Sequence, residues 1–137
     1  MKRSVASGLS ILLIAAMAVF SLGCANKTAR PMEFGMAIPS TGSMTQEKVR
    51  NIILQGAAST TWVLAPESDG RIKAVLSHKG YRLEVAILYT AQSYTIQFVN
   101  GMDNNGSTNY IKAYNSWIKR LDSRIRKEFL QYARYAN

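Results

Sequence analysis

Cysteine and histidine are almost missing from this sequence, which contains one of each, Cys24 and His78. A lone thiol cannot form an internal disulfide, so a disulfide-stabilised scaffold is excluded. A zinc site takes three or four His, Cys, Asp or Glu ligands, and we expect neither a metal nor a cofactor here. The sequence also lacks a Gly-x-Ser-x-Gly elbow. We therefore expect no enzyme, with a small hydrolase using His78 as the one catalytic alternative.

The one long apolar run lies near the N-terminus, from Leu9 to Phe20, after Lys2 and Arg3 and before Gly23. It is shorter than the roughly 20 residues that a transmembrane helix needs. A basic start, an apolar core and a small residue at the end are typical of a secretory signal peptide that is removed. We therefore expect residues 1–23 to be cleaved.

The pair Gly23-Cys24 resembles the end of the lipobox of bacterial lipoproteins, although Ser21 and Leu22 depart from its usual order. The resemblance implies transfer of diacylglycerol to the Cys24 thiol, followed by cleavage before Cys24. Ala25, where inner-membrane lipoproteins of this type have Asp, implies the outer membrane and a periplasmic location. An uncleaved anchor and an ordinary signal peptide with a coincidental cysteine are the alternatives.

Residues 24–43 contain Pro31, Pro39, Gly35 and Gly42 but no sustained hydrophobic period. This composition predicts a lipidated flexible tether, with an average span of roughly 25 Å for about twenty residues. Residues 44–137 are enough for one small domain and too few for two.

The domain is predicted to be α+β, from hydrophobic periods that change along the chain. Helical spacing over 45–58 and 110–132 flanks four segments with strand patterns, at 60–66, 71–78, 81–89 and 93–100. We expect a two-layer α-β-β-β-β-α sandwich, in which a four-stranded antiparallel meander has both helices on one face.

The last helix carries the clearest charge pattern. An apolar stripe falls within about 100° of the helix circumference, as a core-facing surface requires. It consists of Ile111, Tyr114, Ile118, Leu121, Ile125, Phe129 and Tyr132. The basic residues that lie away from it are Lys112, Lys119, Arg120, Arg124, Arg126, Lys127 and Arg134, against only Asp122 and Glu128.

This charge has two interpretations. The whole chain has 17 Lys and Arg against 8 Asp and Glu, and loss of Lys2 and Arg3 with the signal peptide leaves 15 basic residues and a net charge of +7. A solvated face on a basic protein is one interpretation. The other is attraction to an anionic partner such as lipid headgroups, lipopolysaccharide or extracellular nucleic acid. No nucleic-acid fold signature accompanies the charge, so we expect no sequence-specific binding of nucleic acid.

Three segments resemble a group of small Gram-negative lipoproteins. They are "GRIKAVLSHKG" at 70–80, "SYTIQFVN" at 93–100 and "YIKAYNSWIKRL" at 110–121, and the candidate motif positions are Tyr114, Asn115 and Trp117. Lys112 departs from the group, where a histidine is frequent. The group brings no established activity. The aromatic side chains fit a ligand-stacking platform or, more simply, the core, and Asn115 fits a bond to a nearby loop backbone.

From these features we expect a lipid-anchored, non-catalytic cell-envelope module, attached to the membrane through Cys24, that binds or helps to assemble another envelope component. The alternative is a binder of anionic polymers or lipids through the basic helix. The antiparallel meander leaves two sheet edges, so the oligomeric state stays open.

Overall fold

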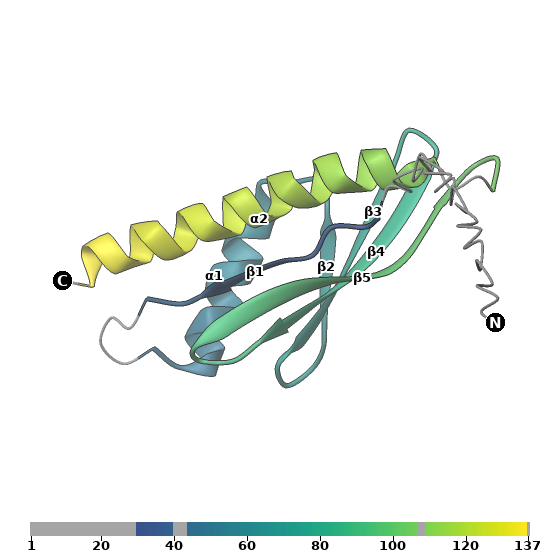
Figure 1. Ribbon diagram of the computed structural model, residues 1–137. Helices are drawn as coiled ribbons and strands as arrows, with labels where there is room; N and C mark the ends of the chain where they lie inside the picture. The colour runs from purple at the N-terminus through teal and green to yellow at the C-terminus, as the bar shows by residue number, and fades with distance from the viewer. Residues whose placement is uncertain (1–29, 40–43, 107–108, 137) are drawn as a thin grey trace, which may run out of the picture.

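The structure is a computed structural model that describes residues 30–39, 44–106 and 109–136. Cys24, the expected signal peptide (residues 1–23) and residues 24–29 and 40–43 of the expected tether lie outside the described residues. The elements along the chain are β1 (Phe34–Ala37), α1 (Gln46–Ala58), β2 (Val63–Ser68), β3 (Arg71–His78), β4 (Tyr81–Tyr89), β5 (Ser93–Asp103) and α2 (Tyr110–Tyr135) (Figure 1).

The sheet has five antiparallel strands in the order β1-β5-β4-β3-β2. The α+β class and the meander of β2 to β5 agree with the prediction, but the predicted count of four strands is wrong. The additional strand, β1, lies inside the segment 24–43 for which we expected a tether. It pairs with β5, a strand about sixty residues further along the chain.

β1 is short, and its close fit to β5 explains its composition. Phe34 and Met36 pair with Ile96 and Tyr94 and pack against the core. Between them, Gly35 has no room for a side chain, because a Cβ atom there would lie 2.8 Å from Cγ2 of Thr95. The strand is followed by Ile38, which is buried and forms part of the core.

The core lies between one face of the sheet and the two helices. Along β3, Ile72, Ala74 and Leu76 are buried while the residues between them are partly exposed. The buried side chains of α1 and α2 join these residues in one cluster, so both helices cover this same face. The predicted stripe of α2 is confirmed at Tyr114, Ile118, Leu121, Ile125 and Phe129, which are buried, while Ile111 and Tyr132 are half-buried.

The two helices approach each other closely at Gly56 of α1. A Cβ atom on this residue would lie 2.8 Å from Cα of Ile125 and 3.1 Å from the carbonyl oxygen of Arg124, both backbone atoms of α2. The absence of a side chain at Gly56 therefore allows the backbones of α1 and α2 to lie this close together.

Two strand ends differ from the prediction. β2 does not stop at Pro66 but continues to Ser68, because β2 is an edge strand, where a missing backbone N–H is tolerated. β5 continues past Asn100 to Asp103. Its pairing register with β4 shifts between Glu84 and Val85, which marks a β-bulge. This bulge brings Gly101 opposite Leu83, where the ring of Tyr110 fills the space that a Cβ atom would occupy.

Among the described residues, no helix is both long and apolar enough to cross a membrane.

Candidate functional site

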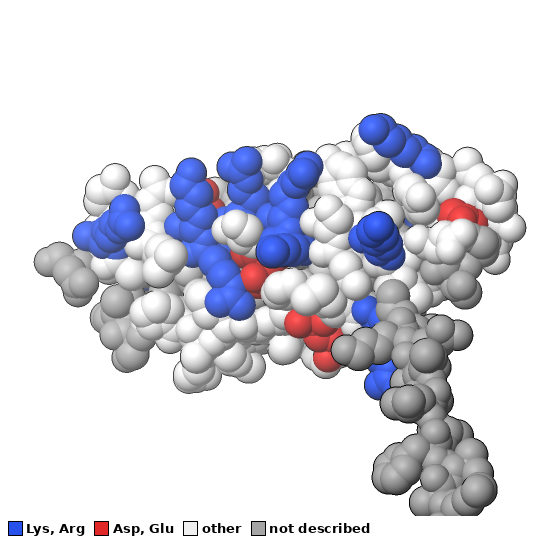
Figure 2. All heavy atoms as spheres, turned by 45° about the horizontal axis from the view of Figure 1, so that its top comes forward, with Lys and Arg blue, Asp and Glu red and all other residues white. Residues whose placement is uncertain are grey.

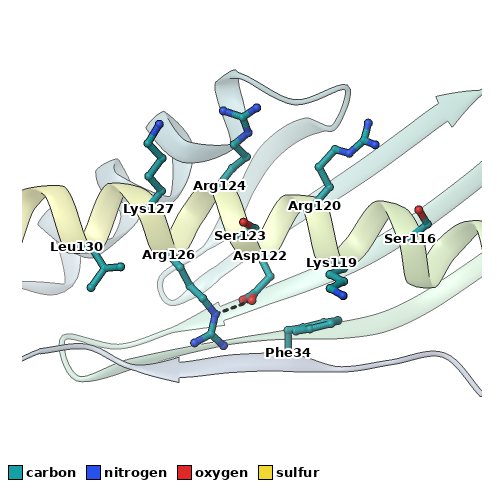
Figure 3. Close-up of a pocket in the computed structure, with 10 residues that line it drawn as sticks. All are labelled: Phe34, Ser116, Lys119, Arg120, Asp122, Ser123, Arg124, Arg126, Lys127 and Leu130. Carbon is teal, nitrogen blue, oxygen red and sulfur yellow. Dashed lines mark hydrogen bonds and ion pairs between the residues drawn. The ribbon is translucent and has the colours of Figure 1, made fainter.

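Five of the seven predicted basic residues line one open groove beside α2, with a volume of about 940 Å³. They are Lys119, Arg120, Arg124, Arg126 and Lys127. Phe34 of β1 lines the groove on its other side, and Figure 3 shows Arg126 and Lys119 projecting toward β1, whereas Arg120, Arg124 and Lys127 project away from it. Lys112 and Arg134, the other two, are exposed nearer the ends of α2.

Six of these seven side chains are exposed and lack an acidic partner. Within the described ranges, the salt bridges are Arg71–Glu67, Lys73–Glu84 and Arg126–Asp122, so only Arg126 of the seven is paired with a carboxylate. Figure 2 shows the blue side chains gathered along α2 with little red between them. We call the six unpaired residues the basic face of α2; they are Lys112, Lys119, Arg120, Arg124, Lys127 and Arg134.

Arg126 differs from the other six basic residues because its guanidinium is hydrogen-bonded to other parts of the protein. Its Nε donates to Oδ2 of Asp122 at 2.6 Å, and its Nη2 donates to the carbonyl oxygen of Gly35 at 2.6 Å. The bond to Asp122 raises the pKa of the guanidinium above its ordinary value. Arg126 thus joins α2 to β1, and its donors are directed at the protein itself.

Asp122 is buried, with only 4% of its surface exposed, and sequence reasoning placed it among the helix charges. Its Oδ1 accepts a hydrogen bond from the Tyr94 hydroxyl at 2.8 Å. Burial, and then the bond to Asp122, raises the pKa of Tyr94 far above its ordinary value. One sequence feature could have revealed this role. Asp122 lies four residues before Arg126 and four after Ile118, at the border of the apolar stripe.

The free energy of unfolding is expected to fall as the pH rises above 10.0, the ordinary pKa of tyrosine. Burial raises the pKa of both Tyr94 and Tyr114 in the folded protein, so the unfolded chain releases these protons first. The stability that they contribute is complete below the unfolded pKa and is lost at about 1.4 kcal/mol per pH unit for each tyrosine above it. Urea unfolding at a series of alkaline pH values measures this slope.

In the same experiment, Tyr114→Phe should remove about half of the slope, since phenylalanine has no proton to release. Tyr135→Phe serves as the control, because Tyr135 is 83% exposed. An unchanged slope in Tyr114→Phe would contradict the assignment.

The motif positions Tyr114 and Asn115 fix the start of the described chain to α2. The Tyr114 hydroxyl donates to the carbonyl oxygen of Met32 at 3.0 Å. Asn115 accepts from the backbone N–H of Met32 at 2.8 Å and donates to the carbonyl oxygen of Arg30 at 3.1 Å. The expected bond from Asn115 to a nearby backbone is confirmed, and its partner is the segment that precedes β1.

The aromatic residues divide between the core and its border. Tyr114 and Trp62 are buried, as the simpler interpretation predicted, whereas Trp117 and Tyr110 are half-buried against the core. Trp117 lies between His78, at 5.0 Å between ring centroids, and the guanidinium of Arg120, at 5.1 Å from its ring centroid. The third motif position therefore orients one cation of the basic face.

His78, Ser77 and Asp103 line a second hollow of about 610 Å³ at the β3–β4 turn. Adjacent residues of a strand point to opposite faces, so Ser77 is directed away from the face that carries His78. Asp103 of β5 lies on the same face of the sheet as His78 of β3, but β4 runs between these two strands, and its Tyr81 pairs with both residues. At the usual strand spacing, the backbones of His78 and Asp103 are therefore about 9.6 Å apart. This arrangement does not bring the three side chains together as a catalytic triad requires.

In the part of the chain that the structure describes, no three His, Cys, Asp or Glu side chains are grouped closely enough to hold a metal ion.

No protein-family model matches this chain, and no curated protein matches it. The candidate site therefore depends on the residues and geometry given above.

Proposed function

We propose that this protein is a lipid-anchored, non-catalytic module of the bacterial cell envelope, and that the basic face of α2 binds the phosphate groups of anionic lipid. The observation that carries the proposal is the set of six exposed cations on one helix without a carboxylate partner among the described residues. A structural role in ion pairing would have placed acidic residues beside them, as it does for Arg126.

The physical chemistry of the face suits a membrane surface. A Lys or Arg side chain near an anionic bilayer contributes about 1 kcal/mol, so six of them contribute several kcal/mol in total. Two large apolar side chains, Leu130 and Tyr135, are exposed among the cations at 52% and 83%. Apolar side chains between cations are typical of helices that lie in the headgroup region.

The hydrogen bond between Asn115 and Arg30 places the start of the described chain beside α2. This supports, as the ligand, a lipid of the membrane in which an acylated Cys24 would be anchored. Cys24 precedes Arg30 by six residues, and a fully extended chain of this length spans at most about 20 Å. An acylated Cys24 would therefore hold the basic face within reach of the bilayer surface, and this proximity raises the effective concentration of its phosphates.

Vesicle binding of a Cys24→Ala variant tests the proposal without a contribution from acyl chains. The variant should bind vesicles that contain phosphatidylglycerol, should not bind phosphatidylcholine vesicles, and should lose binding as salt is added. In this background, Lys119→Glu with Lys127→Glu should weaken binding by at least about tenfold, at about 1 kcal/mol for each charge near the surface.

The matched control is Lys79→Glu with Arg82→Glu, which makes the same change in net charge on two exposed residues, one in the β3–β4 turn and one near the start of β4. An equal loss of binding in both double variants would show that net charge, and not the basic face, controls binding. Binding that is indifferent to salt would also contradict the proposal.

The anchor has its own test. Mass spectrometry of the protein purified from membranes should find Cys24 as the first residue with acyl chains attached. An unacylated chain that retains residues 1–23 would remove this part of the proposal.

A further inference from the structure

The side of α2 that faces away from the core carries a continuous line of exposed residues. At about 100° of rotation per residue, all of them fall within about 60° of Leu130, on the side opposite the buried stripe. We call them the outer line of α2; they are Lys112, Ser116, Lys119, Ser123, Lys127, Leu130 and Arg134. None of these described residues is acidic, and Glu128 instead lines a hollow beside Ile52 and Gln55 of α1. A helix of 26 residues is about 39 Å long, so the outer line can contact a flat surface along most of that length.

Leu130 is the one apolar member of the outer line, and it is 52% exposed. Lys127 precedes it by three residues and Arg134 follows it by four, so a cation lies one helical turn away on either side. Together with Gln131 and Tyr135, these residues line a hollow of about 240 Å³ near the C-terminal end of α2, and none of the described residues that line it is acidic. A single exposed leucine is ordinary on a protein surface. What distinguishes Leu130 is its position between cations on the side of the helix that would meet anionic lipid.

The chain that leads from the expected acyl anchor reaches α2 near the other end of the helix. The side chain of Asn115 donates to the carbonyl oxygen of Arg30, and Arg126, further along α2, donates to that of Gly35. The first described residues therefore run beside α2 in the same direction as the helix, as Figure 1 shows for β1. Fifteen residues separate Asn115 from Leu130, which corresponds to about 22 Å along the helix axis.

We propose that α2 lies parallel to the bilayer surface and that Leu130 inserts among the acyl chains, as a second point of attachment far from the acylated N-terminus. The inference rests on the proposed function, and it adds the orientation of the domain and the side chain that penetrates the bilayer. Helices that lie in the membrane interface bury apolar side chains at the acyl boundary while their cations stay among the headgroups. The long stems of Lys127 and Arg134 let their charged ends remain at the level of the phosphates beside an inserted Leu130.

This orientation directs the uncovered face of the sheet away from the membrane. Val63 of β2 belongs to that face, because it pairs with Val75, whose neighbours Ala74 and Leu76 point into the core. Val63 is 71% exposed, more than Leu130, and should stay in water when the protein is bound. It is therefore the matched control for insertion of an apolar side chain.

Replacement of each apolar side chain by a polar one of similar size tests the insertion. The full chain with Cys24→Ala is bound to phosphatidylglycerol vesicles, and the partition is measured by sedimentation. Leu130→Gln should weaken the partition by about fivefold, since full burial of a leucine favours partition by more than about tenfold and half of this side chain is already buried. Val63→Thr should change it by less than about 1.5-fold. Neither variant changes the net charge, and the unfolding transition of each is first compared with that of the parent.

The depth of each position is measured in the same background with a nitrobenzoxadiazole probe on Leu130→Cys, Ser116→Cys or Val63→Cys. Lipids with a quencher on the headgroup should quench the probes at positions 130 and 116, because both lie on the outer line. Lipids with a quencher in the acyl chain should quench the probe at 130 alone. Neither lipid should quench the probe at position 63.

The results that would overturn the inference differ from those that would overturn the proposed function. Equal effects of Leu130→Gln and Val63→Thr, or equal acyl-chain quenching at positions 130 and 63, would exclude the insertion of Leu130. Headgroup quenching at 130 without quenching at 116 would exclude the parallel orientation. Binding to phosphatidylglycerol vesicles would persist in these cases, and the basic face would remain its explanation. Absence of binding to these vesicles would overturn the proposed function and this inference together.

Discussion

Replacement of Gly56 by leucine is expected to lower the free energy of unfolding by about 3 kcal/mol or more. The nearest atoms to a new Cβ are backbone atoms of α2, at 2.8 Å and 3.1 Å, so no side-chain rotation can make room and the helices must separate. Overpacking of this kind costs about 1–3 kcal/mol and occasionally more. Urea or thermal unfolding followed by circular dichroism measures the loss.

The control places the same residue where α1 faces solvent. Ala58→Leu, at the exposed last position of the helix, should change stability by no more than about 0.5 kcal/mol. Gly56→Ala should fall between the two variants, because its better helix propensity of about 1 kcal/mol offsets part of the clash. Equal stabilities for Gly56→Leu and Ala58→Leu would show that α1 and α2 do not meet as described.

Replacement of Asp122 by alanine is expected to cost about 2–4 kcal/mol. The Tyr94 hydroxyl would lose its acceptor while remaining buried, at a cost of about 1–3 kcal/mol. Arg126 would lose its carboxylate, but its side chain is 37% exposed, so water compensates for much of the lost ion pair. The exposed neighbour Ser123, changed to alanine, is the matched control.

A double-mutant cycle identifies the cause of the loss. Tyr94→Phe removes the donor, so Asp122→Ala should cost less in that background than in the parent protein. Amide hydrogen exchange in β1 should also accelerate in Asp122→Ala, because Asp122 orients the Arg126 side chain that binds the carbonyl of Gly35. Additive effects and unchanged exchange in β1 would contradict the network.

Local patterns were sufficient to predict the parts of the fold whose neighbours lie close in sequence. Buried and partly exposed residues alternate along β3 as far as Leu76 and over the first half of β4, and the Lys79-Gly80 turn between the two strands has the positive φ angles of a two-residue hairpin. The stripe of α2 spans several turns, so its period identified the buried face. The sequence also placed seven cations away from that stripe.

The features that depend on distant contacts could not be predicted. The segment "FGMA" has no pattern long enough to mark β1, and its reason for forming a strand is the pairing with β5. The separate role of Arg126 follows from Asp122 and Gly35, which are brought together by the fold.

The central claim is that the basic face of α2 meets anionic lipid in the cell, and photo-crosslinking from Ser123 tests it most directly. Ser123 is exposed and lines the groove among the cations, as Figure 3 shows, so a photoreactive residue at this position reports what the face contacts. Val63, 71% exposed on β2, is the control position. We predict phosphate-bearing lipid adducts from position 123 that decrease with Lys119→Glu and Lys127→Glu, and few from position 63. Equal lipid adducts at both positions, or adducts to protein alone at position 123, would contradict the account.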